Sequence, residues 1–386
     1  MTSSLSRGIP YAMLALMAAL AACTQVQDTL RSANEQIHEL TGSSPKQNTN
    51  TPAQSNAANT AISAADADVK RAVRLMDGDG VPRDPARAVA IVRPHAEAGH
   101  AEAQFVLGLA YGSGQGIRKD SVSAVAWYRR AAAQDQAHAQ FLLGLALLRG
   151  NGTAKDTNQA TEWFDKSARG GNAGAQYQLA IAYARGQGVQ QDIAVSTQWF
   201  ERAGEQGHAE AQYMAGEAYQ IGRGVPENRA WATRWFTKAA SQGVANGQYM
   251  TGMAFAAGSG APQDLALAYR WLWIAADRGS EKAGPYRDRI GDRLTKDRRA
   301  QVRAAAQSWK PVGAAAATGF DDGPSIAFAQ HALTKLGFDP GIADGKFGPK
   351  TSGAVKAYES ANGLPVTGEI SRALLIRLKD DPIHAG

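Results

Sequence analysis

The chain has 386 residues and a formal net charge of +6, and 44% of its residues are hydrophobic while 20% are charged. This length predicts more than one folded unit, and the composition excludes a mainly disordered chain. Basic residues gather between Lys282 and Lys310, and the sequence has no long Lys/Arg block of the kind found in nucleic-acid-binding arms. We therefore expect no nucleic-acid partner, and interpret the basic cluster as a solvated surface in preference to an anion site.

The N-terminus carries a short apolar run. It extends from Ile9 to Ala22, follows the single basic residue Arg7, and ends at LAAC, residues 20–23. Fourteen residues are too few for a membrane-spanning helix, which needs about 20, so residues 1–22 are interpreted as a secretory signal peptide. A single cysteine is usually a buried thiol, but Cys23, the only cysteine of the chain, lies where the apolar run stops.

The tetrapeptide LAAC resembles the lipobox of bacterial lipoproteins. This resemblance implies cleavage before Cys23, diacylation of its sulfur and acylation of the new N-terminus, which together give durable membrane anchoring. Thr24 in place of Asp implies sorting to the outer membrane. We thus expect a lipid-anchored protein of the cell envelope that faces the periplasm. Residues 23–66 then contain TGSSPKQNTNTPAQSNAANTAISA, which has almost no large apolar residue and predicts a flexible tether.

A glycine-rich stretch, YGSGQGIRKD at residues 111–120, taken alone could form a phosphate-binding loop. Its glycine pair instead recurs every 36 residues, as do a glutamine and a tryptophan. Repetition at this period indicates a repeat architecture rather than a nucleotide site. The recurrent positions are Gly78/Gly80, Gly114/Gly116, Gly150/Gly152, Gly186/Gly188, Gly222/Gly224 and Gly258/Gly260, with Gln104, Gln140, Gln176, Gln212, Gln248 and Trp127, Trp163, Trp199, Trp235, Trp271.

Each repeat predicts a helix, a glycine turn, a capping residue and a second helix. The glycines supply the left-handed conformations that end a helix, and Asp or Asn four residues later is a preferred N-cap. The tryptophans should lie in the core. A further glycine recurs inside the first helix, with Ala180 as the exception, and indicates that a neighbouring helix backbone packs too closely for a side chain. These positions are the caps Asp84, Asp120, Asp156, Asp192, Asn228 and Asp264, and the internal glycines Gly108, Gly144, Gly216 and Gly252.

The pattern A-x-A-Q-[FY]-x-L-G, G-x-G-V-x-x-D and A-x-x-W-[FY]-x-x-A-A-x-x-G resembles the Sel1-like repeat over about residues 67–284. The resemblance implies an all-α protein with an α/α solenoid of about six repeats, related to tetratricopeptide arrays, that binds proteins and has no enzyme activity. After residue 284 the spacing fails, and LTKDRRAQVRAAAQSWKP predicts a terminal capping helix with Trp309 turned inward. The solenoid is assigned to residues 67–310.

The C-terminal segment predicts a small separate domain. Residues 311–323 form a small-residue linker, and apolar positions in residues 324–380 mark three short helices. The string LGFDPGIADGKFGPKT, followed by AVKAY and GLPVTG, closely resembles the three-helix peptidoglycan-binding domain of cell-wall hydrolases, which is a non-catalytic module. By position, the resemblance implies peptidoglycan-binding residues Asp344, Gly345, Lys346, Phe347, Gly348, Thr351 and Tyr358.

Structural roles compete for these residues. Asp344-Gly345 is a turn pair, Phe347 is a core candidate, and Thr351 is a candidate cap of the second helix. The family commonly has Phe-Gln where this chain has Tyr358-Glu359, so the glutamate adds a negative charge there.

Residues for chemistry are scarce. The seven histidines show no metal-ligand spacing, and His100 and His208 share a repeat phase that elsewhere holds Gln136, Asn172, Val244 or Ser280. No catalytic motif is present. We expect no catalytic residue, no metal and no cofactor. The preferred hypothesis is a lipoprotein adaptor that binds peptidoglycan and envelope proteins; the alternatives are a scaffold of a polysaccharide export or synthesis complex, or a cell-wall hydrolase with an unrecognised active site.

Overall fold

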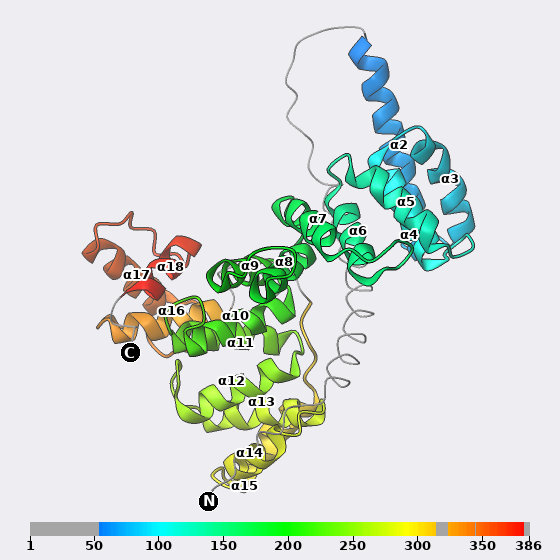
Figure 1. The fold of residues 1–386 in the computed structure, drawn as a ribbon. Coiled ribbons are helices and arrows are strands. Elements are labelled where there is room, and N and C mark those ends of the chain that lie inside the picture. Colours follow the sequence, from blue (N-terminus) through cyan, green and yellow to red (C-terminus); the bar gives the residue numbers. More distant parts are fainter. Residues whose placement is uncertain (1–53, 314–322, 344, 382–386) are drawn as a thin grey trace, which may run out of the picture. The chain divides into compact units, whose positions relative to one another are not determined.

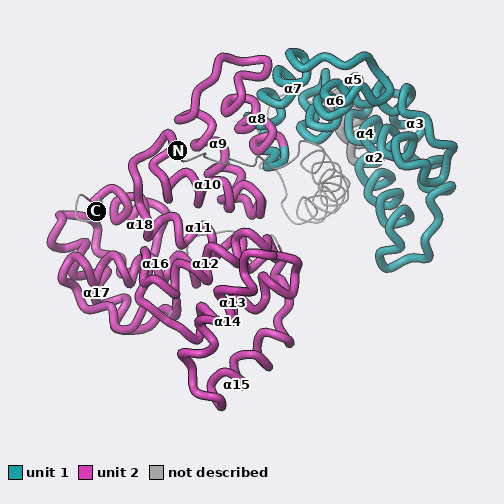
Figure 2. Tube along the Cα trace, turned by 60° about the horizontal axis from the view of Figure 1, so that its bottom comes forward, with its two compact units in different colours: residues 1–174 teal, residues 175–386 magenta. Residues whose placement is uncertain are grey.

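The computed structural model describes residues 54–313, 323–343 and 345–381, with side chains from residue 64 onward. These residues form seventeen helices and no strand, which confirms the all-α prediction (Figure 1). The chain divides into two compact units, residues 1–174 and 175–386 (Figure 2), and each unit is described by itself. The predicted signal peptide and lipid-attachment residue Cys23 lie outside the described residues.

The first helix of the described chain shortens the predicted tether. Helix α2 spans Gln54–Asp77, so residues 54–66, expected as coil, are helical. The segment AISAADADVKRAV is rich in alanine, which has the highest helix propensity of all residues. The low-complexity composition was therefore a poor guide to structure in this segment. Helix α2 packs on α3 and α4 of the first repeats.

Paired antiparallel helices follow in the first unit, each pair being one predicted repeat. The glycine turns and caps fall where the sequence places them. The helices are α3 (Pro85–Glu97), α4 (Ala101–Ser113), α5 (Ser121–Ala132), α6 (Ala137–Arg149) and α7 (Thr157–Arg169).

The second unit continues the same pattern and adds two helices at its end. Helix α14, which was not predicted, lies between the last repeat and the predicted capping helix α15. The helices are α8 (Ala173–Arg185), α9 (Ile193–Glu205), α10 (Ala209–Ile221), α11 (Arg229–Ser241), α12 (Ala245–Ala257), α13 (Leu265–Asp277), α14 (Ala283–Gly291) and α15 (Lys296–Gln307). Trp309 packs edge-on against Trp271, with ring centroids 5.8 Å apart, which confirms its inward orientation.

The two turn glycines have different structural reasons. The first, such as Gly114 with φ +79°, is the left-handed C-cap of its helix. The second, such as Gly116, approaches the preceding repeat so closely that a Cβ would lie 2.1 Å from the Pro85 carbonyl oxygen. All six predicted Asp or Asn caps accept a hydrogen bond from a first-turn backbone N–H, which confirms them.

The glycine inside the first helix of a repeat faces an aromatic ring or, at Gly252, the side chain of Leu272, and this changes the predicted reason for it. A Cβ at Gly108 would lie 2.7 Å from the ring of Tyr128, whereas the nearest backbone atom, the Ala124 carbonyl oxygen, would be 3.4 Å away. Gly216 faces Phe236 in the same way, at 2.6 Å. The glycine thus makes room chiefly for the side chain that follows each tryptophan, not for a backbone.

The tryptophans are core residues only in part of the solenoid. Trp199, Trp235 and Trp271 are buried, as predicted, but Trp127 and Trp163 are half-buried. Arg130 lies 4.4 Å over the Trp127 ring, one helical turn further on. The residue that follows the tryptophan is buried in all five of these repeats. These residues are Tyr128, Phe164, Phe200, Phe236 and Leu272.

The recurrent glutamines close the ends of the second helices. Gln104, Gln140, Gln212 and Gln248 each donate a hydrogen bond to a carbonyl oxygen eight residues earlier, at 2.8–3.2 Å. These carbonyl groups lie in the last turn of a helix, where no intrahelical N–H is available. These hydrogen bonds therefore offset the free-energy cost of burying a glutamine side chain at this phase.

The C-terminal domain consists of α16 (Gly323–Lys335), α17 (Pro349–Ala361) and α18 (Arg372–Asp380). Leu333, Val355, Leu375 and Leu378 are fully buried between them. This confirms the predicted three-helix domain. Helix α16 also packs on α11 of the solenoid within the second unit (Figure 1).

Candidate functional site

Two loops of the C-terminal domain, residues 336–348 and 362–371, lie on either side of α17 in sequence and expose large apolar side chains. Ile342 is 84% exposed, Phe347 47% and Val366 57%. Both loops contact the N-terminal half of α17: Ser352 donates to the Gly368 carbonyl oxygen at 3.0 Å, and Lys350 Nζ lies 3.7 Å from Asp339 Oδ2. These two loops, called the motif loop and the second loop below, form the candidate site.

A buried glutamine holds the motif loop. Gln330 of α16 is 1% exposed; its Oε1 accepts from the Gly345 N–H at 3.0 Å, and its Nε2 donates to the Lys346 carbonyl and to Thr351 Oγ1. The Thr351 hydroxyl in turn donates to the Pro340 carbonyl at 3.1 Å. Three of these hydrogen bonds fix backbone groups of the loop, and the fourth joins the two buried side chains that make them. Each buried polar group of this network thus has a partner.

Glycine at position 345 is required by the backbone. Its φ of +75° lies in the left-handed region, and a Cβ there would lie 2.7 Å from the Gly323 carbonyl oxygen. The turn role proposed for Gly345 is therefore what the structure shows.

A buried glutamate holds the second loop, and this corrects the expectation that Glu359 adds charge to the binding surface. Glu359 is 4% exposed, and its carboxylate accepts from Thr367 N (2.7 Å), Thr367 Oγ1 (2.6 Å) and Gly368 N (2.8 Å). Three donors at these distances balance the buried charge. The negative charge of Glu359 is therefore balanced inside the domain and does not lie on the binding surface.

The predicted site residues separate into a buried and an exposed group. Tyr358 is 1% exposed and packs edge-on against Phe338, so this predicted binding residue belongs to the core of the domain. Thr351 is buried and does not cap α17, which has no side-chain cap hydrogen bond. Phe347, which was also a core candidate, is exposed just before α17. Lys346 and Pro349 beside it are exposed as well.

The remaining predicted residues lie at the surface or beside it. Lys346 is exposed, and Gly345 and Gly348 are half-buried in the motif loop; Asp344 lies outside the described residues. Sequence reasoning missed Ile342 and Val366 as exposed apolar residues. It also missed Gln330 and Glu359 as loop-holding residues, because a single polar residue in a helix carries no signal of what it will contact.

A second candidate site is an apolar cavity of about 150 Å³ in the first unit, between α4, α5 and α6. Its lining includes the apolar residues Phe105, Leu109, Val125 and Leu142. Tyr128 and Arg149 also line it. Burial raises the pKa of Tyr128 above its ordinary value, so its hydroxyl stays neutral. The cavity provides room for an apolar side chain.

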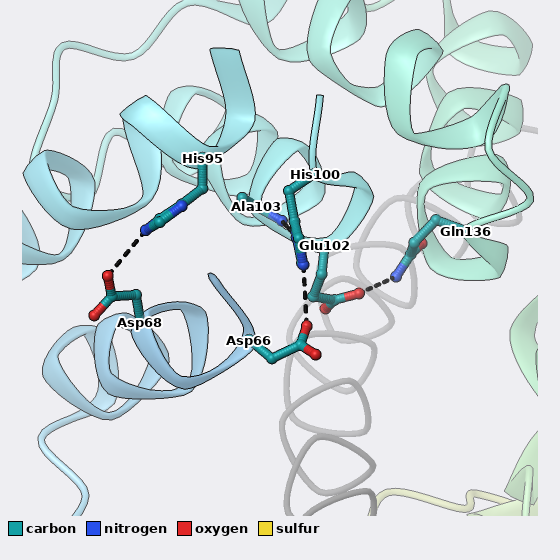
Figure 3. Close-up of polar contacts among 7 residues, drawn as sticks. All are labelled: Asp66, Asp68, His95, His100, Glu102, Ala103 and Gln136. Carbon is teal, nitrogen blue, oxygen red and sulfur yellow. Dashed lines mark hydrogen bonds and ion pairs between the residues drawn. The ribbon is translucent and has the colours of Figure 1, made fainter. Parts of the chain in front are cut away.

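Two histidines of the first unit, His95 and His100, have structural partners (Figure 3). His100 caps α4: its Nδ1 accepts from Ala103 N at 3.3 Å, so its Nε2 carries the proton directed at Asp66, 3.0 Å away. His95 Nε2 lies 2.9 Å from Asp68. Both histidines fasten α2 to the first repeats. At the phase of His100, Gln136 caps α6 in the same way, whereas Val244 makes no side-chain capping bond.

Glu102 lies beside this cap and hydrogen bonds to Gln136 at 3.0 Å (Figure 3). Burial raises the pKa of its carboxyl group, against the opposing effect of the Gln136 hydrogen bond. Within the described part of the chain, no cluster of three or more His, Cys, Asp or Glu residues could hold a metal ion. Among the same residues, no helix combines the length and apolar character that a membrane crossing needs.

Comparison with family models identifies both regions. The Sel1 repeat model matches six consecutive segments, residues 65–100, 101–136, 137–172, 173–208, 209–244 and 245–280. A peptidoglycan binding domain model matches residues 322–378. The predicted repeat and C-terminal families are thereby confirmed.

Solved structures support the same fold. A Sel1 repeat protein from Oxalobacter formigenes is 34% identical with a TM-score of 0.53, over 58% of this chain and 66% of that protein, just under two thirds of its length. The protein c5321, a protective antigen present in uropathogenic Escherichia coli strains that displays an SLR fold, is 23% identical with a TM-score of 0.56, over 83% of this chain and 69% of that one. A search of curated proteins finds no match.

Proposed function

This chain belongs to the Sel1 repeat family and ends in a peptidoglycan-binding domain, and we propose that it is a non-enzymatic adaptor of the bacterial cell envelope. In this proposal the C-terminal domain binds peptidoglycan and the solenoid binds one or more envelope proteins. Lipid on Cys23 anchors the chain to the membrane, facing the periplasm at the outer membrane. Nucleic acid is not among its partners.

The observation that carries the wall-binding part is the pair of held loops. Ile342, Phe347 and Val366 are exposed although their loops are fixed by buried hydrogen bonds from Gln330 and Glu359. A pre-organised surface loses little conformational entropy when it binds. Apolar side chains suit the faces of sugar rings, and exposed Lys346 suits the carboxylates of stem peptides.

Cosedimentation of the full-length chain with purified, protein-free sacculi tests this proposal. We expect the wild type to pellet, Phe347→Ser to reduce the bound fraction strongly, and Lys346→Ala to reduce it mildly, because an exposed ion pair contributes at most about 1 kcal/mol. Ile221→Ser is the matched control, since Ile221 is equally apolar and 67% exposed but lies in the solenoid. A wild-type chain that stays in the supernatant while a known wall binder pellets would refute the wall-binding proposal.

The apolar cavity of the first unit supports the protein-binding part. An apolar side chain of a partner can fill it next to Leu109, which is only half-buried. We expect Leu109→Lys to remove a specific partner from affinity-purified envelope complexes, whereas Ile221→Lys, an exposed position outside the cavity, should retain it. A partner retained equally by both variants would place the binding surface elsewhere.

The anchor is tested through Cys23. We expect Cys23→Ser to leave the precursor unprocessed or to release the chain from membranes, because acylation requires the thiol. Processing and membrane fractionation of the Ser variant like those of the wild type would contradict the lipid anchor.

A further inference from the structure

Three positions on one face of α11 in the fifth repeat contact the C-terminal domain, and two of them, Asn228 and Trp231, differ from all the sister repeats, whereas the sixth repeat also has an arginine, Arg270, at the phase of Arg234. These positions are Asn228, the N-cap of α11, and Trp231 and Arg234 within α11. We propose that this face of α11, with the neighbouring acidic residues of α9, is a dedicated docking site whose occupant is the chain's own C-terminal domain. The wall-binding domain is then carried rigidly on the solenoid.

Asn228 is the only asparagine among the six caps of the second helices; the other five are aspartates. Its Oδ1 accepts from Trp231 N at 2.9 Å, which is the ordinary capping bond. Its Nδ2 donates to the Lys379 carbonyl oxygen of α18 at 3.1 Å. An aspartate could cap α11 equally well but has no hydrogen to donate, and its charge would face a carbonyl oxygen. The Asn228 amide can therefore bond to both Trp231 N and the Lys379 carbonyl oxygen, whereas an aspartate carboxylate could bond only to Trp231 N.

Trp231 supplies the apolar part of the contact. Its phase holds Arg87, Ser123, Gln159, Val195 and Leu267 in the other five repeats. The Trp231 ring is 2% exposed and meets the ring of Phe328 of α16 edge-on, with centroids 4.8 Å apart. Aromatic pairs in this geometry stabilise a contact beyond the effect of the apolar area that they bury. At this phase, the only repeat with an aromatic residue is thus the one that contacts Phe328 of the C-terminal domain.

Arg234 adds a buried polar contact. It is 2% exposed, its Nε donates to Ser325 Oγ of α16 at 2.9 Å, and its guanidinium lies 4.3 Å over the Trp231 ring. Buried arginine is costly unless hydrogen bonds and ring faces replace its water. Ser325 is itself fully buried, so the contact requires the C-terminal domain to be in place.

Complementary charges border this contact. Glu205 of α9 lies 3.2 Å from Arg372 of α18. Lys379 Nζ donates to the Tyr219 hydroxyl at 3.0 Å, and this hydroxyl donates to Glu201 at 2.8 Å. The two glutamates of α9 therefore face the two basic residues of α18, which orients the domain as well as attracting it.

Docking leaves the candidate wall-binding loops open. The contact uses α16 and α18, whereas Ile342, Phe347 and Val366 stay exposed on the loops beside α17. The docked domain can thus engage a ligand without leaving the solenoid. Docking itself does not depend on the proposed wall binding, and only its benefit, a wall-facing surface held at a fixed angle, rests on that proposal.

Spin-label distance measurements on the full-length chain test the docking site. With Cys23 replaced by serine, labels are placed on cysteines at Arg223 of the solenoid and Glu369 of the C-terminal domain, which are both exposed. We expect one narrow distance distribution in the wild-type background. A broad distribution there would overturn the proposal.

The test variant exchanges the three positions for the residues that the fourth repeat has at the same phases, as Asn228→Asp, Trp231→Val and Arg234→Gln. Because Asp192, Val195 and Gln198 are accepted by a folded repeat, the solenoid should keep its helical circular dichroism. We expect at least a tenfold loss of the docked population relative to the undocked one, and a smaller loss for Asn228→Asp alone. The matched control, Asp264→Asn, changes a cap that contacts no other domain and should leave the distribution narrow.

Two results separate the docking site from the wall-binding proposal. A triple variant that folds and keeps the narrow distribution would refute the docking site whatever the chain binds. A narrow wild-type distribution that broadens in the triple variant supports it, even if the wild-type chain fails to pellet with sacculi.

Discussion

The repeats and the C-terminal domain reach stability by different means. In the repeats, a ring such as Phe236 fills the space above a glycine such as Gly216, and this pairing recurs with a 36-residue period, except that Leu272 replaces the ring over Gly252 and Ala180 replaces the glycine in the fourth repeat. In the C-terminal domain, the loops are held by single buried polar side chains, Gln330 and Glu359, that occur once each. A solenoid distributes its stability over many local contacts, whereas a domain of about 60 residues has little core and depends on individual hydrogen bonds.

The strongest test of this comparison removes a ring from the repeats. Phe236→Ala deletes a side chain that is 2% exposed and leaves a cavity over Gly216, so we expect a loss of about 3–5 kcal/mol of unfolding free energy. Trp127→Ala should cost clearly less, because Trp127 is half-buried. Equal losses in chemical denaturation would show that the tryptophan phase matters as much as the phase after it.

A second test removes one polar holder from the C-terminal domain. Glu359→Ala leaves the Thr367 and Gly368 donors without their acceptor, and hydrogen bonds to a charged group contribute about 1.5–3 kcal/mol each. We expect hydrogen exchange of residues 362–371 to accelerate at least tenfold. Glu369→Ala, at an exposed glutamate of the same loop, is the control and should leave exchange unchanged.

A third test fills the space under a ring. Gly108→Ala places a methyl group 2.7 Å from the Tyr128 ring, and we expect a loss of about 1–3 kcal/mol in spite of the better helix propensity of alanine. The fourth repeat already has Ala180 at this phase. If Gly108→Ala instead raises the melting temperature, the ring phase is adaptable and the pairing is less strict than the sequence period suggests.

The smallest effect concerns pH. Burial lowers the pKa of His138 in the folded state, so the unfolded chain binds the proton first as pH falls. The corresponding stability is fully present above the unfolded pKa of about 6.5 and is lost as pH falls below it. We expect His138→Gln to reduce the pH dependence of the melting temperature between pH 7 and pH 5. An identical pH dependence in both chains would contradict a buried neutral histidine.

The sequence was sufficient for the helix ends that recur, although it did not predict that Trp127 and Trp163 are half-buried. The 36-residue period predicted the helix pairs, the Gly114 type of C-cap and all six N-caps, because backbone ends must be satisfied by nearby residues of few types. Motif resemblance likewise predicted both families. The candidate site was predicted only as a region: the motif loop is where the resemblance placed it. Of the two aromatic residues predicted to bind peptidoglycan, Phe347 is exposed, contrary to its alternative core role, and Tyr358 is buried in the core.

Features that occur once were decided by tertiary structure. Glu359 in the sequence is a surface charge beside a tyrosine, and only the fold brings Thr367 and Gly368 to its carboxylate. Asn228 in the sequence is a conservative variant of an aspartate cap, and only the docked α18, some 150 residues later in the chain, makes use of its amide hydrogen. A cap bonds to neighbours three residues away, so local sequence specifies it; the second partner of the same side chain is set by packing between distant segments, which no local pattern encodes.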